Sequence, residues 1–363
     1  MDTSPIAARS LAPYYRIDGD QLGRHYKEHL SGYYDWEDRP HADKYLVFPE
    51  NFGPRMSIDE TSTKDGELFT ILSNKEGHGR KGSIAAIVRG TRVEDVSSAI
   101  NLVPEPIRKQ VGEVTLDFSS SMEAIVQSSF PWAYKTLDRF HMQRMATEAV
   151  QALRRRLLRE AMAEEAKARK NFRAAQKVKR TRVKNSPYYK EGRIKSLPAT
   201  KAYKPKCLPN GDTVPELLTR CSYLLMKSAD KWSDGQKERA KILFNLYPDI
   251  QKAYSLSHSL RVIFNNKNAT PESARMSLKG WYDKVKTFKN EDLHTLAETI
   301  QSREDDVLNF FLFRSTNASA EALNTKIKAF RAQLRGVLDL KFFLFRLTRI
   351  YIETGLYTQI SRK

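Results

Sequence analysis

Between Arg55 and His141, short apolar runs alternate with turn residues, and their order constrains the fold more than any other feature. Five runs of four to six residues predict β-strands. They are residues 56–59, 67–72, 84–88, 114–117 and 133–137. The first three follow one another directly, whereas helical patterns at about 91–101 and 119–130 accompany the later ones. Three consecutive strands followed by alternating strand and helix predict an α/β fold, a mixed sheet with helices on its faces.

Two of the predicted strands end in an aspartate, Asp59 and Asp117. In open α/β sheets ligands collect at the carboxyl ends of the strands, where the loops leave a crevice. Two carboxylates that converge at such a crevice suit a hard cation such as Mg²⁺. An acid after an apolar strand is more often a turn residue or a helix N-cap. The pattern by itself therefore leaves both interpretations open.

A strongly basic segment follows. From Arg154 to Lys206 the chain has 19 Lys or Arg against 4 Glu and no Asp, a net charge of +15 out of +19 for the whole chain. This density predicts contact with phosphates, which gives salt-dependent and largely sequence-blind affinity for nucleic acid. A solvated helix face with a flexible tail is the alternative. The residues expected to contact DNA here are Arg154, Arg155, Lys179, Arg180 and Arg182.

The composition limits the kinds of site that the chain can form and its expected location in the cell. The two cysteines, Cys207 and Cys221, are too few for a disulfide framework or a zinc site of four cysteines. No stretch approaches the roughly 20 apolar residues of a membrane-spanning helix, and residues 1–15 have no apolar signal core. We therefore expect no membrane partner and a cytoplasmic, nucleoid-associated protein.

Shifts in pattern along the chain predict four parts. The parts are an N-terminal extension (1–54), the first part of the core (55–153), a basic helical insertion (154–300) with a flexible linker at about 175–214, and C-terminal helices that complete the core (301–363).

Two motifs in this order resemble a known family. Residues 115–119 (TLDFS) and 137–141 (LDRFH) resemble the middle of the DDE transposases of bacterial insertion sequences, in the branch with a DxS strand end and a DRFH-type motif. Similar stretches occur in the family's order at 58–61, 232–256 and 319–328. The resemblance covers roughly residues 55–352.

The resemblance implies a ribonuclease H-like fold, a mixed five-stranded sheet with an acid on the first strand, a second on the fourth and a glutamate on a later helix. Asp59, Asp117 and Glu321 match these positions, as catalytic residues that hold Mg²⁺ or Mn²⁺, with two ions in all. Glu321 lies 204 positions after Asp117, a separation that requires a large insertion, which the basic helical part supplies.

Three further residues belong to the matching motifs. Lys328 lies two helical turns after Glu321 and is expected to meet a DNA phosphate, with a solvated lysine as the alternative. His141 acts on a proton or a phosphate, or is a structural residue at the start of a helix. Asp138 is an auxiliary acid near the metal ions or a helix N-cap. Asn317 stands where some families have an arginine.

The implied function is a DNA transposase that catalyses metal-dependent strand cleavage and strand transfer as a homo-oligomer on element ends and target. Residues 1–54 contain no match to the zinc-binding and helix-turn-helix region usual in such relatives. A separate small end-recognition protein is one explanation for this, and a truncated or decayed element is the other. Two other functions stay open, a structure-selective nuclease on the same fold and a non-catalytic DNA-binding protein derived from a transposase.

Overall fold

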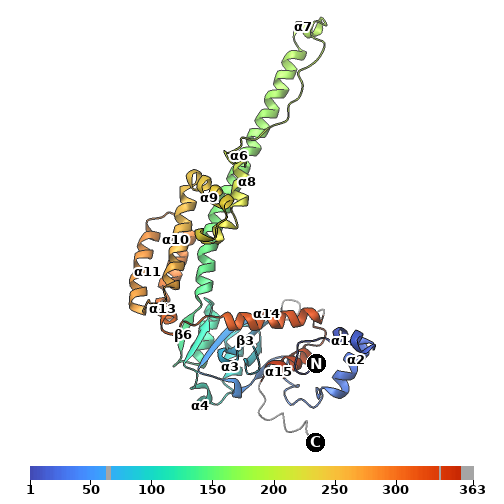
Figure 1. Ribbon diagram of the computed structural model, residues 1–363, viewed down its shortest axis with the longest axis vertical. Helices are drawn as coiled ribbons and strands as arrows, with labels where there is room; N and C mark the ends of the chain where they lie inside the picture. Colours follow the sequence, from blue (N-terminus) through green and yellow to red (C-terminus); the bar gives the residue numbers. More distant parts are fainter. Residues whose placement is uncertain (63–66, 335–336, 353–363) are drawn as a thin grey trace. The chain divides into compact units, whose positions relative to one another are not determined.

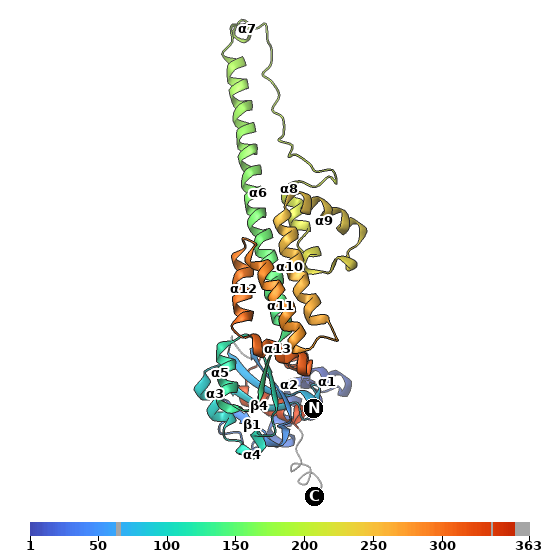
Figure 2. The same ribbon diagram turned by 90° about the vertical axis from the view of Figure 1, so that its left-hand side faces the viewer.

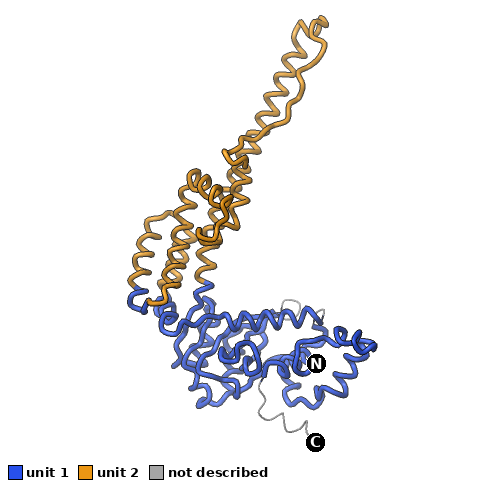
Figure 3. The backbone as a smooth tube through the Cα atoms, viewed as in Figure 1, with its two compact units in different colours: residues 1–141, 269–275, 303–363 blue, residues 142–268, 276–302 orange. Residues whose placement is uncertain are grey.

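The computed structural model describes residues 1–62, 67–334 and 337–352. The chain divides into two compact units (Figure 3). Unit 1 comprises residues 1–141, 269–275 and 303–363, and unit 2 comprises residues 142–268 and 276–302. Each unit is described by itself.

Unit 1 contains a mixed sheet in the order β1-β4-β3-β2-β5-β6. The strands are β1 (Tyr45–Val47), β2 (Arg55–Ser62), β3 (Leu68–Asn74), β4 (Ile84–Arg89), β5 (Glu113–Leu116) and β6 (Tyr134–Leu137). The pairs β1–β4, β4–β3 and β3–β2 are antiparallel, whereas β2–β5 and β5–β6 are parallel. The prediction of a mixed α/β sheet is confirmed.

The number of strands is corrected from five to six, because β1 lies within the range that the sequence assigned to an N-terminal extension. This strand has three residues and pairs with the edge of β4, with Leu46 opposite Ile87. A three-residue strand carries too little alternation to be recognised from its own sequence. It forms because β4 offers an open edge.

The helices of unit 1 lie mainly at the two ends of the chain. They are α1 (Ala8–Tyr15), α2 (Gly19–His25), the π-helical turn η1 (Tyr26–Leu30), α3 (Val93–Ile100), α4 (Glu105–Arg108), α5 (Ser120–Ser129), α13 (Glu304–Phe313), α14 (Ala318–Gln333) and α15 (Leu340–Tyr351). Two short 3₁₀ turns are also present among the described residues of this unit, η2 (Pro49–Asn51) after β1 and η3 (Lys75–Gly77) after β3.

The core of unit 1 joins the two ends of the chain. Leu323, Ile327 and Phe330 lie on one face of α14 and are buried in the same cluster as Phe69 of β3 and Trp36 from the N-terminal part. Helix α14 packs against β2 (Figure 1). The spacing of three or four residues between the buried positions explains this, since it gives α14 one continuous apolar stripe.

The N-terminal residues are held by a buried arginine of α15. Arg346 is 2% exposed, and its Nη2 donates to the carbonyl oxygens of Met1 at 2.6 Å, Ile6 at 3.2 Å and Ser4 at 3.3 Å. A buried guanidinium needs such acceptors to offset its desolvation. The N-terminal residues therefore form part of the structure of unit 1.

Unit 2 is helical. Its helices are α6 (Arg139–Lys184), α7 (Pro187–Lys190), α8 (Val214–Arg220), α9 (Asp234–Leu246), α10 (Pro248–Asn265), α11 (Pro271–Lys286) and α12 (Glu291–Gln301), of which α6 and α11 begin within unit 1. Its short 3₁₀ turns are η4 (Leu224–Met226) and η5 (Ala229–Lys231). Trp281 and Leu260 are among its buried side chains. Over the described helices of both units, none is long and apolar enough to cross a membrane.

Helix α6 is one continuous helix of 46 residues (Figure 2). It ends at Lys184, inside the range 175–214 where the sequence predicts a flexible linker. Beyond Ala161 the helix has no buried residue, so burial does not account for its extension. The reason lies in composition, because Ala, Arg, Lys, Glu and Gln dominate there and have the highest intrinsic helix propensities.

Candidate active site

Three aspartates lie in one register across neighbouring parallel strands. Ser57 of β2 pairs with Thr115 of β5, so Asp59 and Asp117 each follow by two residues and occupy equivalent positions. Leu116 of β5 pairs with Leu137 of β6, so Asp117 and Asp138 directly follow their strands. The prediction that Asp59 ends its strand is wrong, because β2 continues to Ser62 in its pairing with β3. Parallel strands lie about 4.8 Å apart, so the sheet brings the three carboxylates into a row.

Helix α14 adds Glu321 to this row. Three residues after Glu321, Asn324 donates from Nδ2 to Asp59 Oδ2 at 2.7 Å and lies 3.4 Å from the carbonyl oxygen of Glu60. Residues three apart on a helix share a face. Asn324 thus places the face of α14 that carries Glu321 against the end of β2. Asn324 was not among the site residues predicted from the sequence, although its spacing of three residues from Glu321 on a helix was a usable signal.

Charge and burial make Asp59 receptive to a cation. Burial raises the pKa of Asp59, and the negative charges of Asp117 and Glu321 raise the pKa further. The backbone N–H of Glu60 and the charge on His141 act in the opposite direction. A group of partly buried carboxylates at short range repels itself, and a bound cation relieves that repulsion.

Asp138 lies deeper than Asp59 and is fully buried. Burial raises the pKa of Asp138, and the charge of Glu321 adds to that effect. The backbone N–H groups of Phe140 and Asn317 and the charge of His141 lower the pKa. The two residues whose roles the sequence left open, Asp138 and His141, therefore lie within the electrostatic reach of Glu321.

One group of side chains in the described part of the chain has the spacing of metal ligands, and it consists of Asp138, His141 and Glu321. One potential ligand atom from each lies within 4.8 Å of the other two. Asp59 and Asp117 are outside this group. The structure thus brings all five acidic and imidazole side chains to one place, with the closest spacing on the side of Asp138.

A buried polar network supports the loop that leads into α14. Ser315 Oγ donates to Glu113 Oε2 at 2.8 Å, and Lys75 Nζ lies 3.9 Å from Glu113 Oε1 and bonds to Thr115 Oγ1. Glu113 is 1% exposed. Burial lowers the pKa of Lys75 to about 8, against the opposing charge of Glu113. This network ties the loop before α14, and with it the start of the helix, to β5.

The basic surface differs from the prediction at one residue. Arg154 is buried in unit 2, where its guanidinium donates to Gln151 Oε1 at 2.7 Å and to the carbonyl oxygen of Leu218 at 3.0 Å. Its assignment as a DNA contact is therefore corrected to a structural role, because both bonds would have to break first. Of the other candidates, Arg180 is half-buried and bonds to Thr200. The exposed candidates are Arg155, Lys179 and Arg182, and Lys328 on α14.

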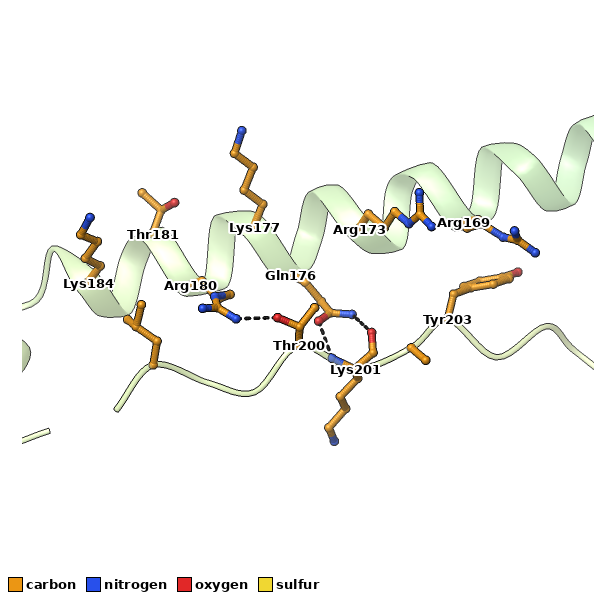
Figure 4. Close-up of a pocket in the computed structure, with 12 residues that line it drawn as sticks. Arg169, Arg173, Gln176, Lys177, Arg180, Thr181, Lys184, Thr200, Lys201 and Tyr203 are labelled. Carbon is orange, nitrogen blue, oxygen red and sulfur yellow. Dashed lines mark hydrogen bonds between the residues drawn. The ribbon is translucent and has the colours of Figure 1, made fainter. Parts of the chain in front are cut away.

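An open groove lies between α6 and the segment that returns beside it (Figure 4). Gln176 holds the segment, accepting from Lys201 N at 2.8 Å and donating to Lys201 O at 2.7 Å. The groove has a volume of about 860 Å³. Its basic lining residues are Arg169, Arg173, Lys177, Arg180, Lys184 and Lys201. Such a lining attracts a phosphate backbone.

A comparison with models of protein families finds one match. The model is that of a transposase family, the ISL3 type of DDE transposase, and it matches residues 56–208 and 211–347, which is most of the chain. Neither the curated proteins nor the solved structures contain a match to this chain.

Proposed function

The chain belongs to the ISL3 family of transposases, and on that premise we propose that it cleaves DNA strands and joins them in a metal-dependent reaction. A transposase acts on DNA, so DNA is a partner of this chain. Asp59, Asp117 and Glu321 are proposed as the catalytic carboxylates. The observation that carries this proposal is the register of β2 and β5, which sets Asp59 and Asp117 side by side next to Glu321.

The order of the strands supports a ribonuclease H-like core. Without β1, the sheet reads β4-β3-β2-β5-β6, with three antiparallel strands and then two parallel neighbours. Asp59 lies on β2, the first of these five in the chain, and Asp117 follows β5, the fourth. Glu321 lies on a helix after the insertion. These are the positions that the family resemblance implies for the three acids.

The donor set fits a hard divalent cation. Three carboxylates supply oxygen ligands, the type that Mg²⁺ and Mn²⁺ accept. Burial raises the pKa of Asp59, the charges of Asp117 and Glu321 add to that effect, and a cation would relieve the repulsion between these charges. Bound ions, two by analogy with the family, would supply the charge stabilisation for in-line displacement at phosphorus by water and then by a 3′-hydroxyl. The chain's own contribution is to hold the carboxylates in place. Asn324 and the N–H of Glu60 orient the two oxygens of Asp59.

The proposal is tested with supercoiled plasmid that carries the ends of the element. Purified protein is incubated with the plasmid and Mg²⁺ or Mn²⁺, and nicked or joined products are measured. Metal-dependent products support a catalytic transposase. No products, even with the product of the neighbouring reading frame added, would favour a DNA-binding protein without catalysis. Cleavage that ignores the element's ends would favour a structure-selective nuclease.

We also propose that recognition of the element's ends requires a separate small protein and that the chain works as an oligomer on paired ends. The described N-terminal residues support the first point, because Tyr33 and Trp36 are buried against α15 rather than presented to DNA. Affinity purification from the native host, followed by mass spectrometry, tests it. Recovery of the chain with no small DNA-binding partner would contradict it.

The hydrogen bond from Asn324 to Asp59 gives a prediction about metal affinity. Asn324→Leu removes the donor 2.7 Å from Asp59 Oδ2 at similar side-chain size. Loss of a residue that orients a metal ligand typically costs about 10–100-fold in metal affinity or activity. We expect the Mg²⁺ concentration for half-maximal nicking to rise by roughly that factor. Thr325→Val, at the exposed neighbouring position, is the control. An unchanged Mg²⁺ requirement in Asn324→Leu would remove Asn324 from the site.

The groove beside α6 gives a prediction about DNA affinity. Arg173, Lys177 and Lys184 are exposed and line this groove. Replacing all three with alanine should weaken binding to any duplex sequence, since phosphate contacts carry no sequence information. Each lost contact releases about one counterion fewer, so the slope of log affinity against log salt should become shallower by about 3. Fluorescence anisotropy with a labelled duplex measures both quantities.

The control for this prediction removes the same charge elsewhere in unit 2. Lys237, Lys241 and Lys284 are exposed on α9 and α11. Their replacement with alanine should change the salt slope much less. Equal losses in the two triple variants would show that net charge, and not the groove, determines the affinity.

A further inference from the structure

We propose that Asp138, His141 and Glu321 form a divalent-cation position of their own, which prefers a first-row transition metal such as Mn²⁺ or Zn²⁺ to Mg²⁺. The proposal rests on the proposed function, because it concerns the same strand ends. It differs in the ligands, since the family resemblance assigns the metal to Asp59, Asp117 and Glu321 and leaves the roles of Asp138 and His141 open.

The backbone places the three side chains together. Asp138 N donates to the carbonyl oxygen of Leu116 at 2.9 Å, which continues the β5–β6 pairing by one residue. His141 follows three residues later, in the first turn of α6, which begins directly after Asp138, and His141 N donates to the carbonyl oxygen of Asp138 at 3.2 Å. Glu321 comes from α14. One potential ligand atom from each lies within 4.8 Å of the other two. Because metal–ligand distances are roughly 2.0–2.4 Å, a small inward movement of the side chains would let all three hold one ion.

A buried oxygen without a partner points to a ligand at this position. Asp138 is 0% exposed, and Oδ2 has no hydrogen-bond partner among the described residues. Oδ1 accepts one long bond, from Phe140 N at 3.4 Å. An unsatisfied buried carboxylate oxygen is costly, and native proteins rarely leave one. A cation bound at Oδ2 would satisfy it.

A second buried side chain near Asp138, that of Asn317, also has polar atoms without hydrogen-bond partners among the residues described. Asn317 is 1% exposed, and neither Nδ2 nor Oδ1 of its side chain has a partner in the described part of the chain. Its backbone N–H acts on the carboxylate of Asp138. At Asp59, by contrast, Oδ1 accepts from Glu60 N at 2.8 Å and Oδ2 from Asn324. Both oxygens of the Asp59 carboxylate thus accept hydrogen bonds, whereas one oxygen of the Asp138 carboxylate has no partner among the described residues.

The imidazole of His141 determines which metal ion the proposed position prefers. Mg²⁺ takes oxygen ligands and keeps several waters, whereas imidazole nitrogen suits transition-metal ions. Two carboxylates and one imidazole leave coordination positions for water or a phosphate oxygen. The position at Asp138 therefore selects Mn²⁺ or Zn²⁺, while carboxylates alone at Asp59 and Asp117 suit Mg²⁺.

The test detects nitrogen bound to the metal. Mn²⁺ alone is titrated into the purified full-length protein without DNA, and pulsed electron paramagnetic resonance records the modulation from ¹⁴N. The wild type should show this modulation, and His141→Gln should lose it and bind Mn²⁺ about tenfold or more weakly. His29→Gln is the matched control, because the His29 side chain is 63% exposed, and it should behave as the wild type.

Two further measurements complete the test. An excess of Mg²⁺ should leave the nitrogen-modulated signal in place. Asp138→Asn, which preserves the shape of the side chain, should weaken Mn²⁺ binding in a protein whose circular dichroism is unchanged. Unchanged Mn²⁺ affinity in Asp138→Asn, or Mn²⁺ binding without ¹⁴N modulation in the wild type, would overturn the proposal.

Failure of this proposal and failure of the proposed function give different results. Plasmid nicking in Mg²⁺ is measured on the same preparations. Nicking without ¹⁴N modulation would leave a transposase whose metal ligands are all oxygens. Modulation without nicking would leave the cation position in place and contradict the catalytic function.

Discussion

Asp117→Asn is expected to lower the rate of plasmid nicking by roughly a thousandfold or more, while affinity for DNA stays the same. The reason is that Asp117 stands at the centre of the row, between Asp59 and Asp138 in the register of three parallel strands. Metal ions at a phosphoryl group supply several kcal/mol of charge stabilisation, and each 1.36 kcal/mol corresponds to a factor of ten in rate. Asparagine keeps the shape of the side chain and removes the negative charge that would hold the metal ion.

The measurement compares initial rates of nicking in Mg²⁺ with binding of the same plasmid by filter retention. Asp95→Asn is the matched control, because Asp95 is exposed on α3 and pairs loosely with Arg92 at 3.9 Å. It should keep the wild-type rate. If Asp117→Asn nicked DNA at more than a small fraction of the wild-type rate, Asp117 would not be a catalytic carboxylate.

Phe330→Ala should lower the free energy of unfolding by about 3–5 kcal/mol. Phe330 is fully buried, its ring stacks on that of Phe343 with 5.6 Å between centroids, and the guanidinium of Arg346 lies 5.2 Å from its centroid. Domains are stable by only about 5–15 kcal/mol in total. Because Phe330 anchors α14, the variant should also lose nicking activity as Glu321 moves away from the strand ends.

Urea unfolding followed by circular dichroism measures the loss, and the midpoint should shift in proportion. Leu338→Ala is the control. Leu338 is 96% exposed and lies between the same two helices, so its truncation should change stability by less than about 0.5 kcal/mol. Equal midpoints for Phe330→Ala and the wild type would mean that α14 is not held by this core.

The sequence predicted much of the sheet, because each long strand carries its own signal. The runs at 56–59 and 84–88 fall within β2 and β4, and the run at 114–117 covers the end of β5 and the residue directly after it. Asp59 and Asp117 could be identified from their positions in these runs, although Asp59 lies inside β2 and not at its end. β1 could not, since its three residues become a strand only by pairing with β4. The C-terminal part predicted to be helical (301–363) contains α13, α14 and α15, although 335–336 and 353–363 lie outside the described residues.

The difference between the predicted and the observed role of Arg154 on α6 has a local cause. Arg154 was grouped with solvent-facing cations by charge, yet it lies four residues after the buried Val150 and so shares the buried face of the helix. That spacing was visible in the sequence and was outweighed by the residue type. The set of residues around Asp138 could not be predicted from local spacing in the sequence. It depends on the register of β5 with β6 and on a helix 180 residues later in the chain, and neither follows from local pattern.

The contacts between Arg346 and residues 1–6 join parts of unit 1 that are made at different times during synthesis. Met1, Ser4 and Ile6 are made long before α15, so their carbonyl oxygens receive their donor only once α15 has been synthesised. Glu321 is likewise made long after Asp59 and Asp117. Domains generally fold as units as the chain emerges. A chain that stops before α14 therefore lacks both the helix that holds residues 1–6 and one of the three proposed carboxylates, and we expect it not to cut DNA.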